Sequence, residues 1–234
     1  MMPFKKKRIA IAVFVKTPGL SPVKTRLAKT IGEKEAEKFY LMSVRKINED
    51  LLSLKNEQNK YEINCYWAVA EEKHYLHGDI WNDFPLLHQP QLDLGGRISA
   101  IYNHLIVQGY DKVILMGADA PHFGSANYLN WCNETVSDDL VSIGPTKDGG
   151  FYCFIGKSKI DASVWTSVVY SSSETAKDLV LALKSKGINS QYLEEGFDVD
   201  EKADLSLLRQ HIQEVKNSYM LPGDRKLLDF IDNL

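Results

Sequence analysis

Cysteine is scarce in this sequence, and long apolar runs are missing. The three cysteines, Cys65, Cys132 and Cys153, form an odd set without C-x-x-C spacing, which argues against a disulfide framework and suits a reducing compartment. Cys65 and Cys153 fall in apolar stretches typical of strands, so we expect core thiols. No apolar run approaches the roughly 20 residues that a transmembrane helix needs. We therefore expect a cytoplasmic protein without a membrane span.

Acidic residues are absent from the first 32 positions, where eight Lys or Arg residues precede Glu33. Much later, the segment "DVDEKAD" (198–204) is strongly acidic. The chain as a whole carries a net charge of -3, which excludes a generally basic, nucleic-acid-binding surface. This asymmetry suggests an anionic ligand on one side of a site and a cation on the other. The alternative interpretation is a solvated basic tail and an acidic helix start.

The composition that is present belongs to a globular protein, with 234 residues, 44% hydrophobic and 25% charged. No linker, repeat or composition break divides the chain. Strand-like and helix-like segments alternate, which predicts a single α/β domain with a mainly parallel sheet flanked by helices. We expect its core over residues 8–213 and a C-terminal helical extension over 214–234. The expected strands cover 8–15, 61–70, 84–89, 112–119, 139–145, 151–156 and 188–195, and the expected helices 32–54, 96–110, 125–136, 172–187 and 201–212.

The loop after the first expected strand, "KTPGLSPVKTRLAK" (16–29), combines two prolines, a glycine and four cationic residues. It has neither the spacing of a P-loop nor that of a dinucleotide-binding fold. Lys16, Lys24 and Arg26 nevertheless lie within eleven positions of one another, and Gly19 can let backbone amides approach a ligand. Such a set suits the oxygens of a di- or triphosphate. A solvated loop without function is the alternative.

Two acidic segments follow expected strands and could hold a metal. Asp119, in "MGADAPHF", comes directly after a buried strand, and Asp198 and Asp200 lie two residues apart. Carboxylate oxygens suit a hard divalent cation, and ligands of α/β sheets gather at the carboxyl ends of the strands. The alternatives are that Asp119 and Asp200 cap helices. His122 is expected to have no ligand role.

Two glycine-containing segments complete the candidate residues. "LDLGGRI" places Asp93, Gly96 and Arg97 at a helix start, where free amides favour an anion or a polar ligand edge. "GPTKDGGFY" contains the turn residues Asp148, Gly149 and Gly150, and its paired glycines could let another molecule approach the backbone. A tight hairpin explains the second segment equally well.

Four of these segments, in this order and spacing, resemble the MobA-like family DUF2064, whose members are called glycosyltransferases on the basis of their fold. The segments are "VKTPGLSPVKTRLA", "MGADAP", "GPTKDGGFY" and "DVDEKADL". The chain is more distantly similar to 2-phospholactate and molybdenum-cofactor guanylyltransferases. The resemblance covers about residues 8–213 and implies a GT-A-type nucleotide-diphospho-sugar transferase fold. Departures occur where "SDxPDL" becomes "ADAPHF", "GDLGxR" becomes "LDLGGR", "WST" becomes "YSS" and "DVDT" loses its threonine.

The resemblance implies roles for the candidate residues. The phosphates of a nucleotide donor would be faced by Lys16, Lys24 and Arg26. The metal, Mg²⁺ or Mn²⁺, would be held by Asp119, Asp198 and Asp200, and the donor would be contacted by Asp93, Gly96 and Arg97. Our own hypothesis adds Gly149 and Gly150 as lining of the acceptor pocket. No base can be named from the sequence: Asp148 is the nearest candidate, and it could equally fix the turn.

The expected activity is a metal-dependent transferase that moves a glycosyl group from a nucleotide-sugar to a small-molecule acceptor. Two alternatives stay open. One is a nucleotidyltransferase that releases pyrophosphate, and the other is a non-catalytic nucleotide-binding module, since the fold does not determine the reaction. No nucleic-acid partner is expected, and homodimer formation is left open.

Overall fold

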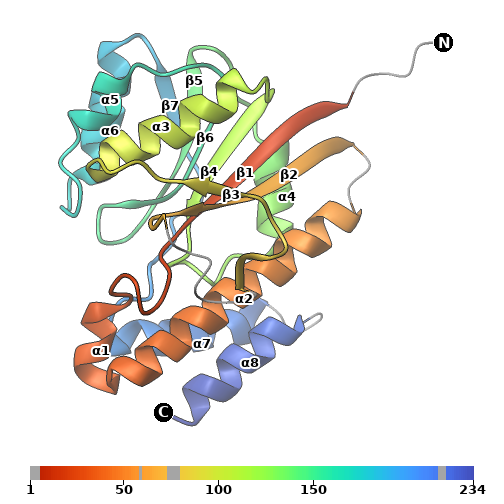
Figure 1. Ribbon diagram of the computed structural model, residues 1–234, viewed down its shortest axis with the longest axis vertical. Helices are drawn as coiled ribbons and strands as arrows, with labels where there is room; N and C mark the ends of the chain where they lie inside the picture. Colours follow the sequence, from red (N-terminus) through yellow and green to blue (C-terminus); the bar gives the residue numbers. More distant parts are fainter. Residues whose placement is uncertain (1–5, 58–59, 73–79, 216–219) are drawn as a thin grey trace.

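The computed structural model describes residues 6–57, 60–72, 80–215 and 220–234 of the chain. Within them, seven strands form one sheet in the order β3-β2-β1-β4-β6-β5-β7 (Figure 1). Neighbouring strands pair in parallel except at β4–β6 and β5–β6, so the predicted mainly parallel α/β sheet is confirmed. The strands are β1 (Lys7–Val15), β2 (Tyr61–Val69), β3 (Leu86–His88), β4 (Lys112–Gly117), β5 (Leu140–Pro145), β6 (Phe151–Gly156) and β7 (Asn189–Tyr192).

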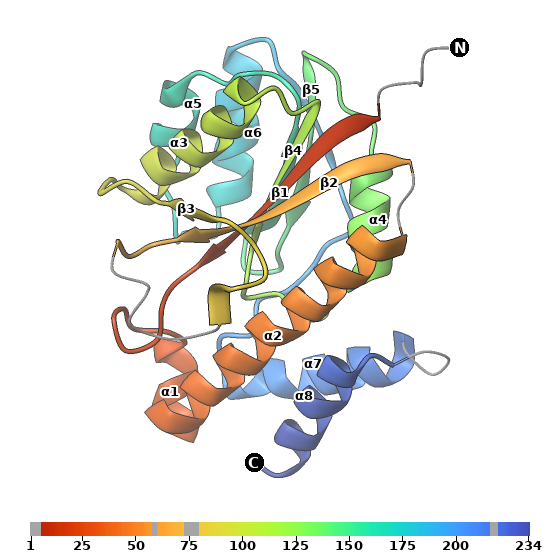
Figure 2. The same cartoon turned by 45° about the vertical axis from the view of Figure 1, so that its right-hand side comes forward.

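Helices cover both faces of this sheet. Helices α3, α5 and α6 lie on one face, and α2 and α4 lie on the other (Figure 1). A third group, α1, α7 and α8, packs around the side of α2 that is turned away from the sheet (Figure 2). The helices are α1 (Thr25–Ile31), α2 (Glu33–Glu57), α3 (Leu94–Val107), α4 (Ser125–Asn133), α5 (Ala162–Thr166), α6 (Thr175–Ser185), α7 (Lys202–Val215) and α8 (Pro222–Asp232).

Strand β1 lies inside the sheet between β2 and β4, a position that suits a strand with two apolar faces. Its residues Ile9, Ile11 and Val13 point to the α2/α4 face, while Ala10 and Ala12 point to the α3 face. Side chains alternate between the faces of a strand, so a continuous apolar run can be buried on both sides. The small alanines leave room for the side chains of α3. The end of β1 is thereby held rigidly at the carboxyl edge of the sheet.

Helices α1 and α5 were not predicted from the sequence. Each is short, with seven and five residues, and short helices are marginal without tertiary contacts. Helix α1 is held by Leu27, which is fully buried among residues of α2, α7 and α8. These contacts join residues far apart in the chain, so no local pattern indicates them.

The structure also describes the three cysteines and the apolar character of the helices. Cys65, Cys132 and Cys153 are free and buried, which confirms the core position expected for Cys65 and Cys153. In the part of the chain that the structure describes, no helix is both long and apolar enough to cross a bilayer.

Candidate active site

A cavity of about 940 Å³ opens at the carboxyl edge of the sheet, where β1 and β4 end. The loop after β1, the residues after β4, the β5–β6 turn, the segment before α6 and the acidic segment before α7 all contribute to its wall. This is where ligands bind in open α/β sheets, and the volume lies in the range of small-molecule sites. The loops that follow these strands, which the sequence predicted to lie together, therefore border one cavity.

The loop after β1 is held at its base by two hydrogen-bonded contacts. The Tyr40 hydroxyl donates to the Lys16 carbonyl and accepts from the Lys16 amide, both at 2.9 Å. The Thr17 amide donates to Glu71 Oε2 at 2.8 Å. Tyr40 belongs to α2 and Glu71 follows β2, so elements on both sides fix the direction in which the loop leaves the strand. The Lys16 side chain is exposed and lines the cavity.

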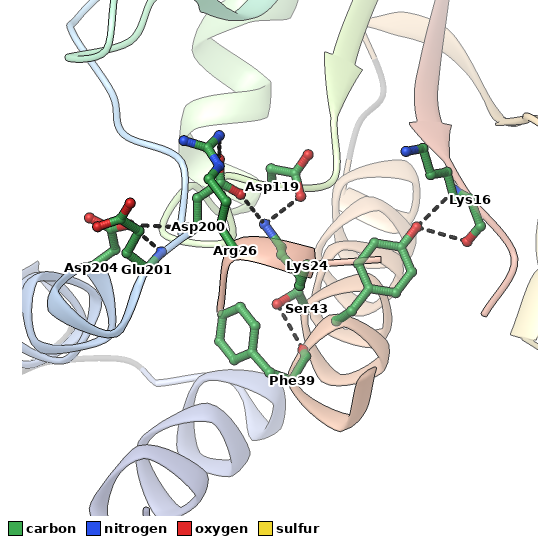
Figure 3. A network of polar contacts seen from close by, with 10 residues as sticks. Lys16, Lys24, Arg26, Phe39, Ser43, Asp119, Asp200, Glu201 and Asp204 are labelled. Atoms are coloured by element: carbon green, nitrogen blue, oxygen red, sulfur yellow. Dashed lines mark hydrogen bonds and ion pairs between the residues drawn. The ribbon is translucent and has the colours of Figure 1, made fainter. Parts of the chain in front are cut away.

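Lys24 turns inward at the other end of this loop. It precedes α1 in the left-handed backbone conformation (φ 47°), which is uncommon for a residue with a side chain, and its side chain is only 2% exposed. Its ammonium forms an ion pair with Asp119 Oδ1 and lies 3.5 Å from Asp200 Oδ1. Arg26 forms an ion pair with Asp200 Oδ2 (Figure 3). Both cations thus face carboxylates in this structure.

Backbone contacts bring the two acidic segments together. The Val199 amide donates to the Asp119 carbonyl at 2.9 Å, which places Asp198 and Asp200 beside the end of β4. Asp204 Oδ2 in turn accepts from the amides of Asp200 and Glu201 at 2.9 and 2.7 Å (Figure 3). The carboxylate that caps α7 is therefore Asp204, and the Asp200 side chain remains available to the cavity.

The charges in this cluster change the ionisation of its members. Burial lowers the pKa of Lys24, but the carboxylates of Asp119 and Asp200 outweigh that effect, so the net shift is upward. Burial raises the pKa of Asp119, yet Lys24, Lys16 and Arg26 together bring it below its usual value, even though half of the side chain remains open to the cavity. These two groups are therefore ionised near neutral pH.

Asp198 differs from the other two carboxyl groups. Its burial and the nearby charge of Asp119 raise its pKa to about 7, and Lys24 offsets this only in part. Like charges confined to one site have this effect. Near neutral pH Asp198 is therefore about half protonated, and the cluster does not carry a third full negative charge beside Asp119 and Asp200.

The three carboxyl groups have the chemistry that a hard divalent cation requires, because their oxygens are the donors that Mg²⁺ and Mn²⁺ prefer, and a bound cation would favour the ionised form of Asp198. The carboxyl groups are not arranged as a preassembled metal centre, because among the described residues no group of three or more His, Cys, Asp or Glu side chains is placed to hold an ion. Lys24 stands between Asp119 and Asp200 instead. A metal would have to share these carboxylates with the ammonium or displace it.

The glycine turn between β5 and β6 contributes two of its three predicted residues to the cavity, Asp148 and Gly150. Asp148 Oδ1 accepts from the Thr146 hydroxyl at 2.6 Å and from the Gly150 amide at 3.1 Å, so it also shapes the turn. Gly149 (φ 88°) packs against the backbone of Ser173, where a Cβ atom would come within 1.9 Å of the carbonyl oxygen. Gly149 joins the turn to the start of α6 and does not line the cavity.

Outside the cavity lining lie three more of the predicted residues, Gly19, Asp93 and Gly96. Asp93 caps α3, its Oδ1 accepting from the Gly96 amide at 2.7 Å. Gly19 (φ 81°) lies exposed in the turn of the first loop. Arg97, in contrast, lines the cavity together with Gln89, and the sequence offered no signal for Gln89.

His122 lies behind the cluster, stacked on the ring of Phe197 at 3.9 Å between centroids. It is 3% exposed, and among the described residues neither of its ring nitrogens has a hydrogen-bond partner. Burial and the neighbouring His211 lower its pKa to about 3, with smaller contributions from Lys46 and Lys147. The ring is therefore neutral at physiological pH and packs the end of β4 against the residue before Asp198.

His122 should make the folded protein sensitive to acid. Its pKa is about 3 when folded and about 6.5 when unfolded, so between these values the unfolded state binds the additional proton and stability falls as the pH falls. From pH 7.5 to pH 5 the loss should be about 2 kcal/mol. Urea unfolding at both pH values measures this contribution as the difference in pH dependence between wild type and His122→Phe, because Asp198, whose pKa is raised, contributes with the opposite sign in both proteins. The exposed His104→Phe serves as the control, and an unchanged pH dependence in His122→Phe would contradict the assignment.

Comparison with known proteins identifies one family. The family model DUF2064, described as "Uncharacterized protein conserved in bacteria", matches residues 51–172, which is just over half of the chain. A search of the curated proteins gives no significant match.

Solved structures share the fold. A "putative nucleotide-diphospho-sugar transferase" from Desulfovibrio desulfuricans G20 is 24% identical, with a TM-score of 0.77 over 96% of this chain and 95% of that one. A nucleotidyl transferase from Methanothermobacter thermautotrophicus is 14% identical, with a TM-score of 0.54 over 89% and 99% of the two chains. A 4-diphosphocytidyl-2C-methyl-D-erythritol synthase from Anaerococcus prevotii DSM 20548 is 10% identical, with a TM-score of 0.50 over 88% and 99%. The predicted nucleotide-diphospho-sugar transferase fold is confirmed.

Proposed function

This chain belongs to the DUF2064 family, and from that membership and its fold we propose that it is a transferase that uses a nucleotide donor. The favoured reaction is transfer of a glycosyl group from a nucleotide-sugar to a small-molecule acceptor, with Mg²⁺ or Mn²⁺. In this reaction the bond between the anomeric carbon and the donor phosphate oxygen breaks. A bond from the same carbon to an acceptor oxygen forms, and a nucleoside diphosphate leaves.

The observation that carries this proposal is the cluster of Lys24, Asp119, Asp198 and Asp200 at the carboxyl edge of the sheet. Such a mixture of buried cation and surplus carboxylate has no packing role that an apolar cluster would not fill at lower cost. It suits a ligand that brings both phosphates and a divalent cation. The cavity around it is large enough for a nucleotide.

Each residue of the cluster then has a distinct task. Asp119, Asp198 and Asp200 would hold the metal, which when bound stabilises negative charge on the donor phosphates. Arg26 is 58% exposed and could turn from Asp200 to a phosphate at little cost. Lys24 would neutralise the carboxylates before the donor arrives and contact its phosphates afterwards. Asp148 uses Oδ1 to hold its turn, and its Oδ2 would accept the proton of the acceptor hydroxyl.

A nucleotidyltransferase is the second candidate, because folds shared with a nucleotidyl transferase and a cytidylyl-type synthase support it. In that reaction the acceptor attacks the α-phosphate of a nucleoside triphosphate, and pyrophosphate leaves. The cationic loop supports a triphosphate less strongly than its sequence suggests, since Lys24 and Arg26 both face carboxylates. Glycosyl transfer therefore ranks first.

A panel of donors tests the proposal directly. The protein is incubated with Mn²⁺ and each nucleoside triphosphate or nucleotide-sugar, and the released nucleoside diphosphate and pyrophosphate are measured. Release of a nucleoside diphosphate from one nucleotide-sugar is the expected result. Pyrophosphate release would instead select the second candidate. Metal-dependent binding without any turnover would favour a binding module, and the absence of nucleotide binding would refute the proposal.

A further inference from the structure

We propose that Arg97, aligned by Gln89, binds an oxyanion of a substrate, a phosphate or carboxylate group, at a second position in the cavity apart from the Lys24 cluster. The inference rests on the proposed function for the identity of the substrate, because the anion would belong to the donor or to the acceptor. It assigns a charge to the part of the substrate that lies near α3.

Gln89 holds the Arg97 guanidinium in place. The Gln89 side chain is 5% exposed, and its Nε2 donates to the Ala68 carbonyl at 2.7 Å. A carbonyl only accepts hydrogen bonds, so the amide nitrogen must be the atom that faces Ala68. The amide oxygen then faces Arg97 and accepts from its Nη1 at 3.3 Å. The orientation of Arg97 is thereby set from the carboxyl end of β2.

The charge of Arg97 is not neutralised within the described part of the chain. No carboxylate there forms an ion pair with it, and its Nε is buried without a hydrogen-bond partner. A guanidinium carries five N–H donors, and Arg97 is half-buried, with part of its side chain open to the cavity. A bound anion would pair with its charge and use donors that Gln89 leaves free. Lys24 and Arg26, by comparison, already have carboxylate partners.

The position of Arg97 separates it from the acidic cluster. Arg97 lies on α3 and contacts Gln89, which follows β3 and is bonded to β2, whereas Asp119 follows β4. Strands β2 and β4 lie on opposite sides of β1. Adjacent strands are spaced by about 4.8 Å, so the two positions are roughly 10 Å apart across the sheet. One extended substrate, or two adjacent ones, could reach both.

The surroundings of Arg97 favour an anion over a neutral group. Leu94 and Ile98 flank Arg97 on α3 and, like Tyr170, line the cavity, and apolar neighbours lower the local dielectric and strengthen a charge pair. A guanidinium offers a planar fork that matches two oxygens of a phosphate or a carboxylate. A neutral sugar hydroxyl would satisfy one donor and leave the charge unpaired. The ligand class is therefore an oxyanion.

The test is a binding titration without metal, so that the acidic cluster takes no part. Wild type, Arg97→Gln, Arg97→Lys and the control Arg45→Gln, which alters an exposed arginine of α2, are titrated in EDTA with pyrophosphate, acetate, UTP, GTP, uridine and guanosine. Arg97→Gln should weaken binding of at least one oxyanion probe by about tenfold. Arg97→Lys should weaken it less, because it retains the charge and loses the fork, and Arg45→Gln should have no effect. Circular dichroism verifies that each variant is folded.

The probes also identify the source of the anion. Weaker binding of UTP or GTP, with uridine and guanosine unchanged, would assign the anion to the donor. Unchanged triphosphate binding with loss of pyrophosphate or acetate binding, measured at saturating triphosphate, would assign it to the acceptor. If no oxyanion probe depends on Arg97 in either variant, the inference is overturned. Arg97-dependent pyrophosphate binding by a protein that fails the donor panel would support the oxyanion site and refute only the proposed reaction.

Discussion

Replacing Asp119 with asparagine should lower metal-dependent turnover by about 100- to 1000-fold, the typical cost of losing one preorganised charge in an active site. Asparagine keeps the size of the side chain and removes its charge. The substitution would withdraw one proposed metal ligand and the principal partner of Lys24, which would then retain Asp200. Mn²⁺ binding, followed by calorimetry in the presence of nucleotide, should weaken in parallel with turnover.

The control for this substitution is Asp229→Asn, which removes the charge of an exposed aspartate on α8 far from the cavity in sequence and in contacts. It should leave turnover and Mn²⁺ binding unchanged. Thermal unfolding of both variants separates loss of activity from loss of the fold. Full metal-dependent nucleotide binding by folded Asp119→Asn would show that Asp119 is not a metal ligand.

Replacing Lys46 with methionine should lower the free energy of unfolding by roughly 3 to 5 kcal/mol, because it leaves the buried carboxylate of Asp50 without its counterion. The Lys46 ammonium donates to Asp50 Oδ2 and to the Phe123 carbonyl, both at 2.6 Å, and lies 3.5 Å from Asp224 Oδ1. All three charged side chains are fully buried. The effect should be measured by urea unfolding at neutral pH.

Lys46, Asp50 and Asp224 form a buried cluster, the Lys46 cluster. Its location explains why disrupting it should destabilise the whole fold. Lys46 and Asp50 lie on α2, Asp224 lies in the first turn of α8, and Phe123 precedes α4. The cluster therefore joins the sheet-covering helices to the C-terminal layer. Asp224 also caps α8 by accepting from the Leu221 amide at 3.2 Å.

Two further variants separate the mechanism from a general loss of packing. Lys46→Met combined with Asp50→Leu removes the carboxylate that had lost its counterion and should recover part of the loss. Lys177→Met, which breaks the exposed pair with Glu174 on α6, should leave stability unchanged within error. A cost for Lys46→Met as small as that of Lys177→Met would mean that the buried carboxylates do not need the ammonium.

Cavity residues were identified from the sequence more successfully at strand ends than at helix starts. Lys16, Lys24 and Asp119 were selected because they follow apolar strands or lie in a cationic loop, and all three line the cavity. Asp93 and Gly96 were selected by a helix-start pattern, and that pattern described the cap itself. A capping aspartate and a ligand-binding aspartate look alike in sequence, because both stand before a helix.

The pairing of charges was not predictable. The sequence predicted that Lys24 and Arg26 face phosphates, and the structure places both against Asp119 or Asp200, more than ninety positions away in the chain. The left-handed backbone of Lys24 turns its side chain inward, and that conformation depends on how the loop closes. For the same reason the sequence could not show that Arg97, unlike Lys24 and Arg26, forms no ion pair with a carboxylate of the described residues.

The sequence by itself determined the α/β order, the burial of β1, the core position of the cysteines and the strand ends at which charged residues gather. These properties follow from local composition and from periodicity along the chain, which each segment carries alone. Only the tertiary structure decided the two short helices, the buried Lys46 cluster and the division of the cavity's cations into paired and unpaired ones. Each of these depends on contacts between distant segments, whose energies are set by burial and by the nearest opposite charge.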